Sequence, residues 1–110
     1  MLTMLLLGAS ALPAAAPVQA APVKTKREAC SAVKVRVAAD RHFPVSAVAF
    51  CDTISLSDSP PGYYVLALHS RRQCAGICST NMGWFAIDEK TGRVFNFDVG
   101  EWKVGSPVGG

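Results

Sequence analysis

Two runs of alternating apolar and polar residues lie near the C-terminal end of the chain, at residues 84–88 and 94–98, separated by Glu-Lys-Thr-Gly-Arg. Alternation with a period of two predicts strands, and a short connection that contains glycine predicts a β-hairpin. We expect a three-residue loop in which Gly92 adopts the left-handed conformation, so that residue 87 pairs with 95 and residue 85 with 97. This register sorts the apolar from the polar positions, whereas a four-residue loop would mix them. The inner face would then consist of Phe85, Ile87, Phe95 and Phe97.

Two further strands are predicted before this hairpin. Residues 45–56 alternate in a way that would place Phe50 in the core. Residues 63–70 are rich in aromatic and branched side chains, which favour strands, and their inward positions would be Tyr64, Leu66 and Leu68. The Pro-Pro-Gly sequence at residues 60–62 cannot lie within a sheet and predicts the turn between the two strands.

The segment before these strands has two interpretations. Residues 33–37 alternate as a strand would. Over a longer window, however, small and apolar residues recur at helical spacing, and Pro44 ends the pattern. We favour a helix over residues 26–42. The predicted fold class is α+β, with one N-terminal helix packed on a four-stranded antiparallel meander sheet. Residues 21–27 are expected to form a mobile lead, and residues 100–110 a frayed tail.

The first twenty residues contain no charged side chain, and they end in the small-x-small sequence Val18-Gln19-Ala20. This pattern predicts a signal peptide that is cleaved after Ala20. The alternative is a membrane anchor, but a spanning helix needs ~20 apolar residues and this stretch is broken by Pro13 and Pro17. Residues 21–110 are long enough for one small domain. We therefore expect a single domain in the periplasm or outside the cell.

Four cysteines fit an exported domain whose core is small, because disulfides persist in oxidising compartments and stabilise small folds. The close spacing of Cys74 and Cys78 favours a local disulfide, which leaves Cys30 to pair with Cys51. Mixed pairings such as Cys51 with Cys74 remain open, since four cysteines allow three connectivities. A zinc site formed by two thiols with a histidine is disfavoured by the exported context and by the spacing. We expect no metal and no cofactor.

Charge and candidate catalytic residues narrow the possible functions. The net charge is +3, and the basic residues concentrate in the N-terminal half, where they favour an anionic partner or form a solvated helix face. They are not interleaved with aromatic residues, which argues against nucleic acid binding. Ser79, His69 and Asp98 supply the residue types of a hydrolytic triad, but no nucleophile-elbow sequence surrounds a serine. We expect no enzymatic activity.

The connection at residues 71–82 is longer than a hairpin requires, which suggests a function for it. A disulfide within the connection would stiffen it and reduce the entropy lost on binding. Tyrosine, tryptophan and arginine are the residue types that anchor protein interfaces. We therefore predict that this loop and the outer sheet face bind another protein through Tyr63, His69, Arg71, Arg72, Ile77, Ser79, Met82 and Trp84.

The run Tyr63-Tyr64-Val65-Leu66-Ala67-Leu68, followed by Asp88-Glu89-Lys90-Thr91-Gly92-Arg93-Val94, resembles the ending of PepSY-type domains. That resemblance implies a small helix-plus-sheet module that binds a protease or an envelope component. In its signal sequence, cysteines and element order, the chain is also similar to periplasmic immunity proteins that neutralise peptidoglycan amidases delivered by type VI secretion. This second resemblance implies an inhibitor that inserts its Cys74–Cys78 loop into a hydrolase cleft, and it is the interpretation we favour.

Overall fold

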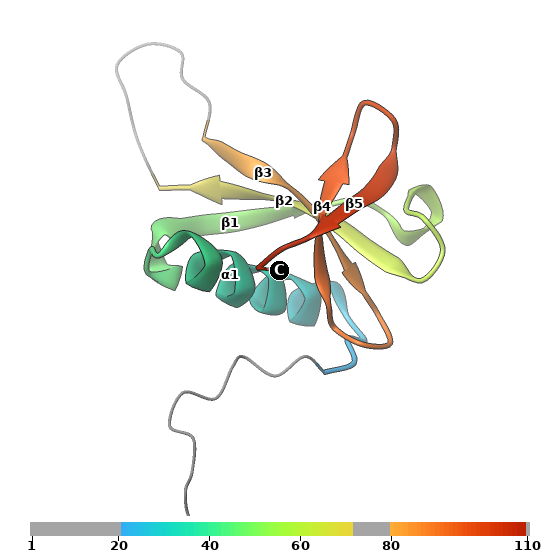
Figure 1. Cartoon of the computed structure of the whole chain (residues 1–110), viewed down its shortest axis with the longest axis horizontal. Helices are drawn as coiled ribbons and strands as arrows, with labels where there is room; N and C mark the ends of the chain where they lie inside the picture. Colours follow the sequence, from blue (N-terminus) through green and yellow to red (C-terminus); the bar gives the residue numbers. More distant parts are fainter. Residues whose placement is uncertain (1–20, 72–79, 110) are drawn as a thin grey trace, which may run out of the picture.

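The structure is a computed structural model that describes residues 21–71 and 80–109. In this part of the chain, one helix covers one face of a five-stranded antiparallel sheet with the strand order β1-β2-β3-β4-β5 (Figure 1). The elements are α1 (Lys26–Arg41), η2 (Val45–Ala47), β1 (Val48–Thr53), η3 (Leu56–Asp58), β2 (Tyr63–Ser70), β3 (Asn81–Asp88), β4 (Val94–Asp98) and β5 (Lys103–Pro107). The α+β class and the meander are confirmed. The count of four strands is wrong, because the tail that was expected to fray forms β5.

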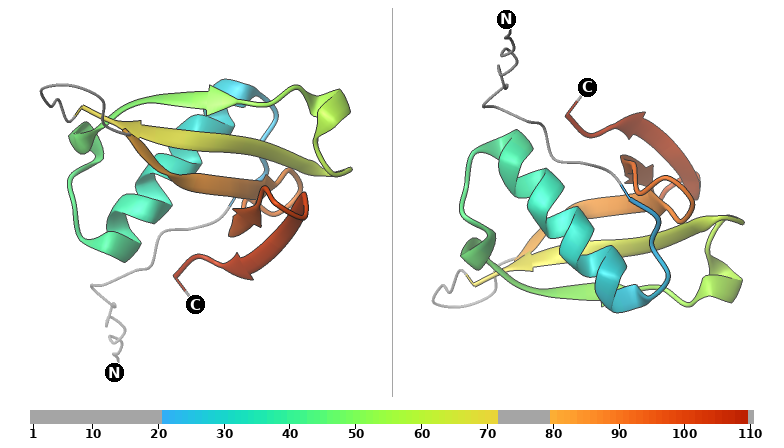
Figure 2. Two further views of the ribbon diagram at one scale, coloured as in Figure 1. Left: turned by 90° about the horizontal axis from the view of Figure 1, so that it is seen from above. Right: turned by 90° about the horizontal axis from the view of Figure 1, so that it is seen from below.

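Helix α1 begins and ends close to where the sequence predicts. The Thr25 hydroxyl accepts a hydrogen bond of 3.0 Å from the backbone N–H of Glu28, which satisfies one of the free donors of the first turn. At the other end His42 adopts a left-handed conformation and its N–H bonds to the carbonyl of Ala38. The buried side of the helix carries small residues, including Ala29 and Val33, so the helix can lie close to the sheet. The views in Figure 2 show it crossing one face only.

The β3–β4 hairpin differs from the prediction in its register. Ile87 pairs with Val94, and the N–H of Asp88 bonds to the carbonyl of Arg93 at 3.0 Å, which closes a four-residue loop. The cause is the Asp88 side chain, whose Oδ1 accepts the N–H groups of Lys90 and Thr91 and stabilises the longer turn. The expected left-handed conformation of Gly92 is confirmed, with φ at 73°. The three-residue register is wrong.

This register gives the sheet two apolar faces. On the helix side the core includes Phe85, Ile87, Val94 and the predicted inward residues Tyr64, Leu66 and Leu68. On the opposite side Phe97 is buried together with Val65 and Ala86, and Trp84 and Val104 pack against them. The expectation that Phe95 and Phe97 share a face with Phe85 is therefore wrong. Strands β4 and β5 turn away from the direction of β1 to β3, as Figure 1 shows.

A bulge near the start of β1 changes which side chains face inward. Val48 pairs with Ser70, whereas Phe50, two residues later, pairs with the adjacent His69. A bulge inserts one extra residue and turns the following side chains to the other face. Cys51 consequently faces the helix, and the Phe50 side chain is 54% exposed. The prediction that Phe50 belongs to the core is wrong.

Both ends of the described chain are held against the sheet. Val23 is buried, and its N–H bonds to the carbonyl of Glu89 at 2.8 Å, so the lead segment is fixed rather than mobile. Val108 is buried as well, and its N–H bonds to the carbonyl of Val94 at 2.9 Å. Arg36 of the helix donates to the carbonyls of Val108 and Gly109. The tail thus bridges the sheet and the helix.

Candidate protein-binding surface

Three of the eight predicted binding residues, Arg72, Ile77 and Ser79, lie outside the described residues. The predicted disulfide between Cys74 and Cys78 lies outside them too. The five described residues are Tyr63, His69, Arg71, Met82 and Trp84.

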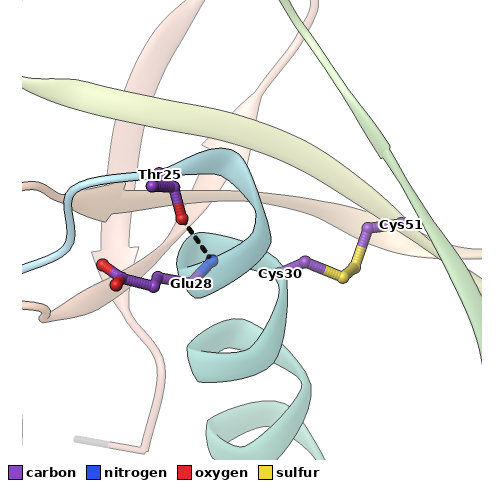
Figure 3. The surroundings of a disulfide bond; sticks show 4 residues. All are labelled: Thr25, Glu28, Cys30 and Cys51. Atoms are coloured by element: carbon purple, nitrogen blue, oxygen red, sulfur yellow. Dashed lines mark hydrogen bonds between the residues drawn. A yellow bond between two sulfur atoms is a disulfide. The ribbon is translucent and has the colours of Figure 1, made fainter.

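The disulfide between Cys30 and Cys51 is confirmed, and Figure 3 shows it joining α1 to β1. It links residues separated by 21 positions, with Cα atoms 5.9 Å apart. Because β1 lies at one edge of the sheet, the bond fixes the position of this edge strand relative to the helix. The surface next to β1 is therefore held in place by a covalent cross-link.

His69 and Phe50 form a stacked pair on the face of the sheet opposite the helix. Their ring centroids are 4.6 Å apart and the rings are inclined by 6°. The Nδ1 atom of His69 shares a hydrogen bond of 3.1 Å with the hydroxyl of Thr80, which fixes the orientation of the imidazole. Sequence reasoning missed Phe50 because strand alternation alone assigns it inward, and only the bulge turns it outward.

Trp84 lies on the same face as this stacked pair. It pairs with Ala67 on β2, and its half-buried side chain packs on the cluster formed by Val65, Ala86 and Phe97. The prediction had placed Trp84 on the face away from the helix, and that placement is confirmed. We call Phe50, His69 and Trp84 the outer aromatic surface.

Tyr63 does not join this surface. It lies at the opposite end of β2 from His69, where its ring makes an edge contact with Phe95 at a centroid distance of 6.1 Å. Six residues of extended strand separate Tyr63 from His69, or roughly 20 Å. A single contact patch that includes both residues would have to span most of the length of β2.

Arg71 and Met82 lie on either side of residues 72–79 in the sequence, and their side chains have different surroundings. Arg71 is exposed, and its Nε donates a hydrogen bond of 2.8 Å to the carbonyl of Ser46, which ties the end of β2 to η2. Met82 packs its side chain against the helix-side core. Met82 is half-buried, because a bulge at the start of β3 turns it toward the helix side. Its role in binding remains a prediction.

Two of the three residues considered for a hydrolytic triad, His69 and Asp98, lie within the described residues. Asp98 accepts the N–H of Glu101 at 3.0 Å within its own turn, while the hydrogen-bond partner of His69 is Thr80, so the two are not brought together. Among the described residues, no three His, Cys, Asp or Glu side chains are grouped closely enough to hold a metal ion. A shallow depression near the end of α1 is lined by Arg36, Ala39, Asp40, His42 and Gly109 and is open to solvent.

In residues 21–71 and 80–109, no helix combines the length and the apolar composition needed to cross a membrane. No protein-family model matches the chain, and no curated protein or solved structure shows significant similarity to it.

Proposed function

We propose that this chain is an exported binding protein without catalytic activity, and that it inhibits a cell-wall hydrolase by covering the entrance to its active site. The observation that supports this proposal is the exposure of Phe50. The Phe50 side chain is 54% exposed and therefore contributes little to the core. Its strand, β1, is held by pairing with β2 and by the Cys30–Cys51 disulfide. Phe50 is well placed, however, to be buried against a partner.

The composition of the outer aromatic surface supports an interface function. Aromatic side chains bury large areas and dominate the energetics of protein interfaces. Arg71 follows His69 by two residues, just beyond the end of β2, and adds an exposed cationic residue at the same end of this strand. Arginine and aromatic residues are enriched together at such sites.

The rigidity of the same surface favours tight binding. The imidazole of His69 stacks on the Phe50 ring, and its Nδ1 atom shares a hydrogen bond with the Thr80 hydroxyl. Side chains that are already oriented lose less conformational entropy when a partner binds, at roughly 0.5–1.5 kcal/mol for each side chain that would otherwise be immobilised. A preformed surface of this kind suits an inhibitor that binds without rearranging.

Export is supported by the signal-like sequence before Ala21 together with the Cys30–Cys51 disulfide, since disulfides are typical of oxidising compartments. The participation of residues 72–79, including a Cys74–Cys78 loop, remains a prediction from the sequence. Of their two flanking residues, Thr80 bonds to His69 of the Phe50–His69 pair, and Arg71 follows His69 by two positions. A loop that starts and ends there would extend the same surface.

The proposal is tested by inhibition of hydrolysis. The oxidised chain from residue 21 onward is added to isolated peptidoglycan sacculi together with exported hydrolases of the same cell and products of neighbouring genes, and the release of soluble fragments is followed. We expect one of these enzymes to be inhibited stoichiometrically. Phe50→Ser should weaken inhibition by at least about tenfold, as loss of a buried aromatic anchor does.

Leu56→Ser is the matched control, because Leu56 is 50% exposed but lies on η3 rather than on the outer aromatic surface. It should inhibit as the unaltered chain does. Equal loss in both variants would place the interface elsewhere. Inhibition of none of the hydrolases would reject the inhibitor function, and binding without inhibition would favour a regulatory module instead.

A further inference from the structure

Strand β1 presents an open hydrogen-bonding edge. It is the first strand in the sheet order, so within the described residues it has a neighbour, β2, on one side only. The N–H of Ile54 bonds to the carbonyl of Val65 on β2, at 2.9 Å. Backbone groups of an antiparallel strand point alternately to its two sides. Cys51 and Thr53, which lie three positions and one position before Ile54, therefore direct their N–H and C=O groups toward the open side.

The two edges of the sheet differ in how well they are protected against strand addition. Strand β5 contains Lys103, Gly105 and Pro107, and charge, glycine and proline are residues that block pairing at an edge. Strand β1 has a bulge at its beginning, but residues 50–53 contain neither lysine nor proline. Of the two edges, β1 is the one able to accept another strand.

On the helix side of this edge the charge has one sign. The helical neighbours of Cys30 at the positions four before, three before and four after it are Lys26, Arg27 and Lys34. Residues at these spacings lie on the same side of a helix. The disulfide from Cys30 to Cys51 places that side of α1 beside β1. Three cations thus flank the open edge on its helix side.

These three cations form no ion pair with an acidic residue in the described part of the chain. The ion pair found there joins Lys103 to Glu101. On the other face of β1 the conditions differ, because Asp52 is exposed there and Phe50 supplies an apolar surface. An incoming strand would meet positive charge on one face. On the other it would meet an aromatic ring beside a carboxylate.

We infer that β1 binds an extended acidic segment of the partner protein, which adds to the sheet as a sixth strand. Its backbone pairs with Cys51 and Thr53. Its acidic side chains alternate toward Lys26, Arg27 and Lys34, and the intervening apolar side chains lie toward Phe50. The inference rests on the proposed function, since it specifies how a partner of that binding protein would be held. Main-chain hydrogen bonds give affinity in this mode, and alternate side chains give specificity.

The test uses a fluorescein-labelled peptide of alternating glutamate and valine as the probe, added to the oxidised chain at low ionic strength. We expect saturable binding, with exchange protection gained at the amides of Cys51 and Thr53. A lysine–valine peptide should bind at least about tenfold more weakly than the glutamate–valine peptide does at low ionic strength. High salt should weaken binding of the glutamate–valine peptide by a similar factor. A glutamate–valine peptide that is N-methylated at alternate residues should fail to bind, because its strand-pairing donors are removed.

Protein variants complete the test. Arg27→Glu with Lys34→Glu should abolish binding of the glutamate–valine peptide, whereas Lys90→Glu at the β3–β4 turn carries the same type of charge change and should not. Thr53→Pro removes an outward N–H and is tolerated by an edge strand, so it should fold and lose the peptide.

Four outcomes would overturn the inference: no binding up to about 1 mM peptide, equal binding of the N-methylated peptide, protection at amides outside β1, or association of the chain with itself through this edge. If any one of these outcomes is seen while hydrolase inhibition persists, strand addition is wrong and the proposed function stands. If the peptide binds as expected and no hydrolase is inhibited, the edge site stands and the proposed function fails.

Discussion

The side chain of Arg41, in the last turn of α1, donates a hydrogen bond of 2.7 Å from Nη1 to the backbone carbonyl of Met82 at the start of β3. The same guanidinium lies 5.4 Å from the centroid of the Phe85 ring. At this point β3 is irregular, because Gly83 has φ at 127° and its N–H bonds to the side chain of Asn81 at 2.6 Å. One side chain of the helix therefore holds the bulge that turns Met82 into the core.

Replacing this arginine should destabilise the fold moderately. Arg41→Met keeps the aliphatic stem but removes the hydrogen bond and the cation–π contact, and we expect a loss of about 1 kcal/mol in the free energy of unfolding, because the site is exposed. Urea denaturation followed by circular dichroism measures it. Arg27→Met is the control, since Arg27 is exposed near the helix start and should change stability little. Equal effects of the two substitutions would contradict a specific role for the Met82 contact.

Loss of the Cys30–Cys51 disulfide should have a larger effect. The bond closes a loop of 21 positions, for which the chain-entropy relation gives about 3 kcal/mol. The double variant Cys30→Ala/Cys51→Ala should lose stability on this scale in the absence of reductant. Peptide mapping without reduction should recover a fragment that joins Cys30 to Cys51. A fragment that joins either of them to Cys74 or Cys78 would contradict the connectivity.

The elements that were predicted correctly are those determined by local pattern. Helix α1 was favoured over a strand because its helical spacing extends over a longer window that ends at Pro44, and strand β2 follows the Pro-Pro-Gly turn. Their inward residues follow directly from the spacing of their apolar positions. The Cys30–Cys51 pairing was predicted because the close spacing of Cys74 and Cys78 favours a local disulfide and leaves these two cysteines.

The errors have a common origin in hydrogen bonds that alternation does not reveal. One acceptor, Asp88 Oδ1, lengthens the β3–β4 turn by one residue and moves Phe97 to the other face. A bulge in β1 exposes Phe50, and a bulge in β3 turns the half-buried Met82 toward the helix-side core. Because a shift of one residue reverses every side chain that follows, small local features decided which residues form the candidate surface.

The β3–β4 turn contains a close contact that a single methyl group would disturb. A Cβ on Gly92 would collide with the backbone of Ala21, and the residue has φ at 73°. Gly62 has φ at 84°, but a Cβ there would meet nothing within 4 Å. Both alanine substitutions should cost about 1–2 kcal/mol for the left-handed backbone. Gly92→Ala should cost more, because the segment that precedes Val23 must move.

Thermal unfolding of the two alanine variants checks this difference. The matched control is a chain that lacks Ala21, in which Gly92→Ala should cost no more than Gly62→Ala does. If Gly92→Ala is as mild as Gly62→Ala in the chain that retains Ala21, then the lead segment does not lie against the turn.

The last prediction concerns Trp102, the residue that sequence reasoning assigned to a frayed tail. Its indole Nε1 donates a hydrogen bond of 2.8 Å to the carbonyl of Asp58, and its ring meets Phe97 edge-on at a centroid distance of 5.1 Å. It also has φ at 55°, which is unfavourable for a bulky side chain. These contacts tie the β4–β5 turn to η3, so Trp102→Phe should lower the free energy of unfolding by about 1 kcal/mol through loss of the hydrogen bond.

Trp84→Phe is the matched control, because it makes the same change in ring size at a half-buried tryptophan with no indole hydrogen bond among the described residues. Amide exchange should distinguish the two variants. Trp102→Phe should accelerate exchange at the amides of β5 and η3 and leave those of β2 unchanged, since local contacts set local opening. Trp84→Phe should leave β5 and η3 unaffected. Equal acceleration at β5 in both variants would show that the β4–β5 turn is held by packing of the sheet face rather than by the bond from Trp102 to Asp58.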